Sequence, residues 1–126
     1  MREILFRGKR LDNGKFSQGD LSRFPNGTVR INPHEYGQPW LGYEVNPETI
    51  CQYTGMTDKN GVKIFEGDIV KRFWFGEESI YCIEYDESSA VFIGMALNKS
   101  RFTTFDNDGE MFEVIGNIYD NPELLE

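Results

Sequence analysis

The sequence contains one histidine and two cysteines, residue types that often provide general bases, nucleophiles and metal ligands. His34 lies in a loop beside Glu35, and neither Cys51 nor Cys82 has a nucleophile motif around it. Both cysteines fall within apolar strand patterns, where a reduced thiol packs as a small hydrophobic group. We therefore expect no catalytic residues, no metal site and no cofactor. An enzyme that uses His34 or a carboxylate cluster is kept as a third hypothesis.

Two aspartate-rich segments resemble the start of a calcium-binding loop. They are Asp58-Lys59-Asn60-Gly61 and Asp106-Asn107-Asp108-Gly109. A calcium loop needs further oxygen ligands at regular spacing and a final glutamate, whereas Met111 and Phe112 occupy such places after the second segment. Both segments are better explained as hairpin turns.

Three aromatic residues in an irregular segment are candidate binding residues. Tyr36, Trp40 and Tyr43 lie between Pro33 and Pro47, among glycines and prolines. An aromatic loop of this kind can form a binding surface. Alternatively, its rings can fold back over the open end of a small β core.

The N-terminal end is basic and supplies two further candidates, Arg7 and Arg10. Residues 1–30 contain seven Lys/Arg and three Asp/Glu, with phenylalanines between them. Basic side chains that neutralise phosphates, together with aromatic rings that stack on bases, are typical of nucleic-acid binding. Alternating strands would also place basic residues outward and aromatic residues inward without any such function.

The formal net charge of −8 is unevenly distributed. Residues 1–66 carry nine Lys/Arg and eight Asp/Glu, a net of +1, and residues 67–126 carry four and thirteen, a net of −9. The acidic half argues against a plain nucleic-acid clamp, because it would repel phosphate. It is compatible with a mimic of DNA that occupies a nucleic-acid-binding protein, or with charge pairing between copies in a homo-oligomer.

The pattern of apolar residues predicts an all-β protein. Thirteen glycines and five prolines indicate many turns and hence many short strands. The expected strands are Arg2–Gly8, Lys15–Phe24, Thr28–Asn32, Thr49–Thr54, Val62–Phe65, Ile69–Phe75, Ser79–Tyr85, Ala90–Ala96 and Glu110–Tyr119. Asn60-Gly61 favours a type I′ turn, in which both residues have positive φ. Asn46-Pro47 and Asn121-Pro122 each predict a single helical turn capped by the asparagine.

We expect two closely packed β parts that form one compact unit. Residues 1–66 would form a twisted β-hairpin or meander part, packed on a C-terminal SH3-like small barrel of residues 67–126. The boundary is placed near Glu66–Gly67, where glycine and aspartate suit a bend between strands. No apolar run is long enough to cross a bilayer or to act as a secretory signal, so we expect a cytoplasmic protein without a membrane partner.

The order of these motifs resembles the YopX protein family, which is encoded in phages and prophages of Gram-positive bacteria. The matching segments are Ile4–Lys9, Gly19–Leu21, Val45–Thr49, Gln52–Gly55, Asp58–Gly61, Ile64–Val70 and Ile115–Leu125. Phe16 and Cys51 depart from the family pattern, which often has Trp at the first position and a small residue at the second. The resemblance implies a mostly β, phage-derived protein in the cytoplasm of a bacterial host, and it brings no catalytic residues.

The function that these observations favour is a non-enzymatic accessory protein that binds another protein, of the host or of the phage. The aromatic segment and the acidic half are its motivating features. The alternative, from another class, is direct nucleic-acid binding through the basic N-terminal end, with Arg7 and Arg10 as contact residues.

Overall fold

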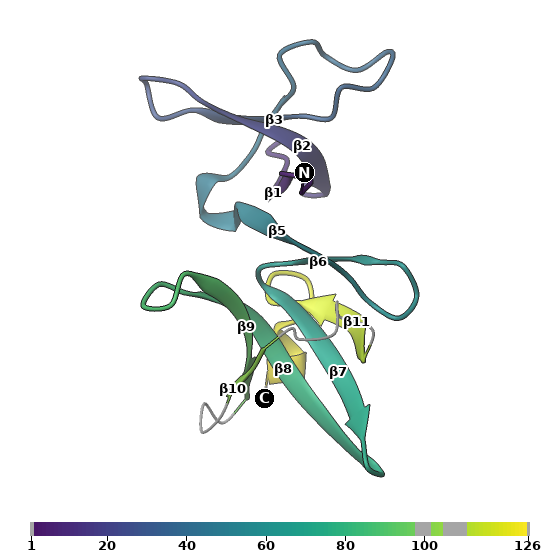
Figure 1. The fold of residues 1–126 in the computed structure, drawn as a ribbon. Helices are drawn as coiled ribbons and strands as arrows, with labels where there is room; N and C mark the ends of the chain where they lie inside the picture. Colours follow the sequence, from purple (N-terminus) through teal and green to yellow (C-terminus); the bar gives the residue numbers. More distant parts are fainter. Residues whose placement is uncertain (1, 98–101, 105–110, 126) are drawn as a thin grey trace. The chain divides into compact units, whose positions relative to one another are not determined.

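The computed structural model describes residues 2–97, 102–104 and 111–125, and these form two compact units. Unit 1 is Met1–Tyr53 and unit 2 is Thr54–Glu126. The strands are β1 (Phe6–Lys9), β2 (Phe16–Arg23), β3 (Val29–Asn32), β4 (Tyr43–Glu44), β5 (Cys51–Thr57), β6 (Lys63–Phe65), β7 (Asp68–Trp74), β8 (Glu77–Asp86), β9 (Val91–Ala96), β10 (Phe102–Thr103) and β11 (Phe112–Asn117) (Figure 1). The all-β prediction is confirmed, because almost all regular structure consists of antiparallel strands.

The two predicted helical turns are present as 3-10 helices. They are η1 (Pro47–Thr49) and η2 (Pro122–Leu125). Asn46 caps η1, because its side-chain oxygen accepts a hydrogen bond from the Glu48 N–H at 3.0 Å. In the part of the chain that the structure describes, no helix is both long and apolar enough to cross a membrane.

Unit 1 is an antiparallel sheet in which β4, β3, β2, β1 and the start of β5 lie side by side in that order. Val29 and Ile31 are 4% and 0% exposed, which confirms the alternation predicted for β3. They form the core of this unit with Val45. Gly8 fits against Val45 because it has no side chain: a Cβ at Gly8 would lie 3.0 Å from Val45 Cγ2.

Unit 2 is built on a five-stranded sheet in the order β10-β9-β8-β7-β11. Its core contains Val70, Tyr81, Ile83 and Phe112, which come from three of these strands. The rings of Tyr81 and Phe112 pack edge to face with centroids 6.3 Å apart. The closed SH3-like form expected for residues 67–126 stays a prediction.

The turn between β5 and β6 differs from the predicted type I′ geometry. Gly61 has a φ of +81°, but Asn60 is not among the described residues with positive φ. The Gly61 N–H donates to the Asp58 carbonyl oxygen at 3.0 Å, which is the pattern of a type I turn that ends in a left-handed glycine. The cause is the Asp58 side chain, whose Oδ1 accepts hydrogen bonds from the N–H groups of Asn60 and Val62 at 2.8 and 2.9 Å.

The same carboxylate connects this turn to the last strand of the sheet. Asp58 is 5% exposed, and its Oδ2 accepts a hydrogen bond from the Val114 N–H at 2.9 Å. On the same edge of β11, the Lys59 N–H donates to the Phe112 carbonyl oxygen at 3.0 Å. Further along, the Asn117 N–H donates to Asn121 Oδ1 at 3.2 Å. Three backbone groups of β11 that do not face β7 are therefore hydrogen-bonded by other parts of unit 2.

These contacts explain why the two units divide between Tyr53 and Thr54 and not near Glu66–Gly67, where the sequence analysis placed the boundary. β5 crosses the division, and its second half pairs with β6 inside unit 2. Ile64 of β6 is fully buried in the unit 2 core. The hairpin that was assigned to the N-terminal part thus packs with the C-terminal strands. The predicted turn Asp106-Asn107-Asp108-Gly109 lies outside the described residues.

Asp58→Ala should lower the free energy of unfolding by about 3 kcal/mol, because three backbone N–H groups lose their shared acceptor. Asp58→Asn keeps one oxygen and should have a smaller effect. Lys59→Gln is the control, since it removes an exposed ion pair with Glu113 and should cost no more than about 0.5 kcal/mol. Chemical denaturation monitored by tryptophan fluorescence measures all three, and an Asp58→Ala protein with the wild-type midpoint would contradict this role.

Candidate functional site

The segment between β3 and β4, residues 33–42, is the aromatic loop, and it presents large side chains to solvent. Tyr36 is fully exposed, and Trp40 is 83% exposed. Leu41 beside it is also exposed. The rings do not fold back over the unit 1 core, so the alternative of a loop that covers the core does not apply to Tyr36 and Trp40. Tyr36 and Trp40 thus expose large apolar side chains on the surface of unit 1.

Local hydrogen bonds hold the backbone of this loop. The Asn32 side chain spans it: Nδ2 donates to the Trp40 carbonyl oxygen at 2.7 Å, and Oδ1 accepts from the His34 N–H at 2.9 Å. Two turns lie inside, in which Gln38 N–H donates to the Glu35 carbonyl at 3.1 Å and Gly42 N–H to the Pro39 carbonyl at 2.9 Å. The backbone of the loop therefore has a defined conformation, which fixes the positions from which its aromatic side chains extend.

Gly42 closes the loop at a position where only glycine fits. Its φ is +80°, and a Cβ there would lie 2.4 Å from the Ile31 carbonyl oxygen. Its own carbonyl oxygen accepts a hydrogen bond from Arg30 Nη1 at 3.0 Å. This close approach fixes the point where the chain enters β4.

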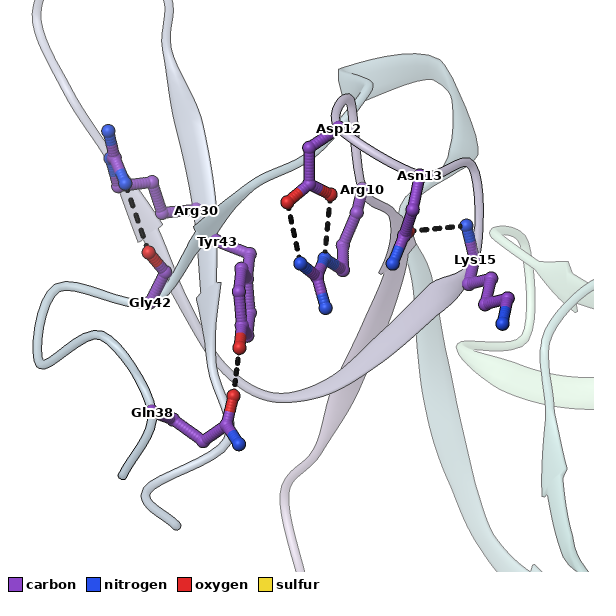
Figure 2. A network of polar contacts seen from close by, with 8 residues as sticks. All are labelled: Arg10, Asp12, Asn13, Lys15, Arg30, Gln38, Gly42 and Tyr43. Atoms are coloured by element: carbon purple, nitrogen blue, oxygen red, sulfur yellow. Dashed lines mark hydrogen bonds and ion pairs between the residues drawn. The ribbon is translucent and has the colours of Figure 1, made fainter. Parts of the chain in front are cut away.

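Tyr43 links the loop to the turn between β1 and β2 (Figure 2). Its hydroxyl donates a hydrogen bond to Gln38 Oε1 in the loop. Its ring stacks on the Arg10 guanidinium, with Arg10 Cζ 3.5 Å from the ring centroid. Figure 2 shows that both carboxylate oxygens of Asp12 accept hydrogen bonds from the same guanidinium. Arg10 Nε donates to Oδ1 at 2.8 Å, and Nη2 donates to Oδ2 at 2.5 Å.

The Arg10–Asp12 contact alters the pKa of both groups. The hydrogen bond from Arg10 lowers the pKa of Asp12 below the ordinary value of an aspartate. In turn, the hydrogen bond to Asp12 raises the pKa of Arg10. Arg10 is thus a fixed cation whose donors are directed at Asp12 and whose face lies on Tyr43.

The five candidates from the sequence have different environments. Tyr36 and Trp40 are exposed on the loop, whereas Tyr43 is half-buried and stacked on Arg10. Arg7 is only 8% exposed on β1, and its Cζ lies 4.5 Å from the centroid of the Phe16 ring. The structure brings Tyr43 and Arg10 together, and places Arg7 in a separate, buried cluster.

Sequence reasoning missed the partners that organise this surface, namely Asp12, Gln38 and Asn32. Only Asp12 had a usable signal, because it lies two residues after Arg10 within a tight turn. His34 pairs with Asp20, with Nε2 and Oδ2 2.8 Å apart, and both side chains are mostly exposed. Among the described residues, no three His, Cys, Asp or Glu side chains gather closely enough to hold a metal ion.

Comparison with known proteins identifies the family. A family model described as "YopX protein" matches residues 5–126, nearly the whole chain. The chain belongs to the YopX family. The resemblance inferred from its motifs is thereby confirmed.

A solved structure is similar to this chain over its full length. The chain is similar to the crystal structure of protein EF1440 from Enterococcus faecalis, with a TM-score of 0.61 and 26% identity. The similarity covers 100% of both chains. The comparison with curated proteins found no match.

In this YopX protein, Arg10→Met should raise the pKa of Asp12 towards the ordinary value, since the main cause of its shift is removed. A lowered Asp12 pKa stabilises the folded protein at pH values above the pKa that Asp12 has in the unfolded chain. This stabilisation is lost as the pH falls through the Asp12 pKa of the folded protein. Carboxyl carbon NMR titration measures the shift. Asp86 is the control, because its lowered pKa comes from Ser89 and Ser88 and should not move. Identical Asp12 titrations in both proteins would contradict this account.

Proposed function

We propose that this YopX protein is a non-enzymatic protein-binding module and that the aromatic loop is its contact surface. The observation that carries the proposal is the exposure of Tyr36 and Trp40 on a loop whose backbone is held by hydrogen bonds. Aromatic side chains of this size are enriched at protein interfaces and dominate their energetics. A loop that is already ordered loses less conformational entropy when it binds.

The charges near the loop favour a partner with an apolar pocket and a mixed polar rim. Arg10 is paired with Asp12, and the His34 ring is hydrogen-bonded to Asp20, so polar donors and acceptors lie beside the loop. Such groups provide hydrogen bonds and orientation at the rim of an interface. The proposed partner is a protein of the bacterial host or of the phage, which fits a chain of this family.

The direct nucleic-acid alternative has less support from the two arginines on which it depends. Arg7 is buried against Phe16, and Arg10 already gives two donors to Asp12. A phosphate at Arg10 would have to displace that carboxylate.

The exposed His34–Asp20 pair also differs from the buried histidine–carboxylate pairs that orient a general base, which supports a non-enzymatic role.

Tyr36→Ala combined with Trp40→Ala should abolish capture of the partner from nuclease-treated host lysate. Trp40→Ala alone should weaken binding of the purified partner by about 2 kcal/mol, because a central aromatic contact is truncated. Isothermal titration calorimetry with the captured and purified partner measures the loss. Phe102→Ala, which truncates an exposed aromatic side chain in unit 2, is the matched control and should bind as the wild type does.

Two results would count against the proposal. The first is an unchanged affinity of the double variant for the partner. The second is capture that disappears with nuclease, or that Arg10→Glu abolishes while Trp40→Ala does not, which would favour the nucleic-acid alternative.

Light scattering at low and high salt checks the separate expectation of a homo-oligomer, whose mass should fall with salt if charge pairing holds it together.

A further inference from the structure

The turn between β7 and β8 has a bulky residue where the backbone favours a small one. Phe75 and Gly76 have φ values of +50° and +80°, the pattern of a two-residue type I′ turn. Asparagine, aspartate and glycine are the usual residues at the first position, because a Cβ with a large substituent is disfavoured at positive φ. A phenylalanine at this position lowers the stability of the turn.

Two phenylalanines at the end of this hairpin are exposed to solvent. Phe75 is 88% exposed, and Phe73 is 62% exposed. Phe73 stands opposite Glu78 in the strand register, so its ring and that carboxylate lie on the same face of the hairpin. Glu77 follows the turn directly and is exposed. These four residues, Phe73, Phe75, Glu77 and Glu78, are called the hairpin tip.

We propose that the hairpin tip is a docking site for a lysine- or arginine-rich segment of a partner protein. Exposed aromatic faces attract ammonium and guanidinium groups, and adjacent carboxylates pair with the same cations. Lys71 Nζ lies 3.8 Å from Glu78 Oε1, at the long end of ion-pair distances, so a cation of the partner competes with Lys71 for Glu78. Unit 2 contains six Lys/Arg and fifteen Asp/Glu, a net of −9, which attracts a basic segment from a distance. The same charge repels anionic lipid.

This site is separate from the aromatic loop of unit 1 and does not depend on the proposed function. The test selects a phage-displayed random-peptide library on the whole immobilised protein, with counter-selection on the Phe75→Asn variant. Enriched peptides are synthesised, and their affinities are measured by fluorescence anisotropy at low and high salt. The proposal expects peptides rich in Lys and Arg whose affinity falls with salt.

Phe75→Asn should weaken peptide binding about tenfold, because one cation–π contact is lost. Glu77→Gln with Glu78→Gln should also weaken it and reduce its salt dependence. Val91→Ala, an exposed apolar control in unit 2, and Trp40→Ala in the aromatic loop should leave the affinity unchanged. If Trp40→Ala weakened the peptide and Phe75→Asn did not, the binding would belong to the aromatic loop and this proposal would be wrong.

The Phe75→Asn variant also distinguishes docking from a structural role. Asparagine tolerates positive φ, so the variant should unfold at a temperature about 3 °C higher than the wild type while it binds less tightly. A lower unfolding temperature together with lost binding would mean that Phe75 supports the hairpin, and would overturn the proposal. Selection of acidic or purely apolar peptides, no Phe75-dependent enrichment, or Phe75-dependent binding to phosphatidylglycerol vesicles would overturn it too.

Discussion

A buried carboxylate with backbone donors around it is the constraint on which unit 2 depends. Asp58 is 5% exposed and accepts hydrogen bonds from Asn60, Val62 and Val114. A buried carboxylate without such partners would be strongly destabilising, so the turn and the last strand must form together around it. Asp68 acts similarly at the next bend, where it is 1% exposed and accepts from the Phe65 N–H at 2.8 Å. Both aspartates lie in segments by which the sequence resembles the YopX family, and in both segments the carboxylate holds backbone N–H groups in place.

In unit 1, hydrogen bonds shape an exposed loop instead of a buried turn. Its loop between β3 and β4 is organised by Asn32, Gly42 and Tyr43, while the largest rings are left in solvent. The structure thus separates the residues that shape the loop from those available to a partner. Tyr43 and Arg10 belong to the first group, although residue type alone made them resemble the second.

The sequence predicted what depends on local pattern and missed what depends on distant contacts. The period-2 alternation at Val29 and Ile31 was sufficient to assign the buried face of β3, and the Asn46 cap of η1 followed from Pro47. The Asn60-Gly61 dipeptide alone predicted the wrong turn type, because the Asp58 side chain holds the turn, and the bond from the same carboxylate to Val114, 56 residues away, had no local signal. The exposure of Tyr36 and burial of Arg7 likewise result from tertiary packing, for which single-residue preferences give no sign.

The terminal strand β11 has a consequence for how the protein behaves at high concentration. A strand at the end of a sheet ordinarily offers a row of backbone donors and acceptors to which another chain can add. Here Asp58 Oδ2 accepts a hydrogen bond from the Val114 N–H, and Asn121 Oδ1 accepts one from the Asn117 N–H. The Lys59 N–H donates to the Phe112 carbonyl oxygen. Side chains and a turn thus take the place of a neighbouring strand, and this edge is protected against strand exchange and fibril growth without the need for another β-strand.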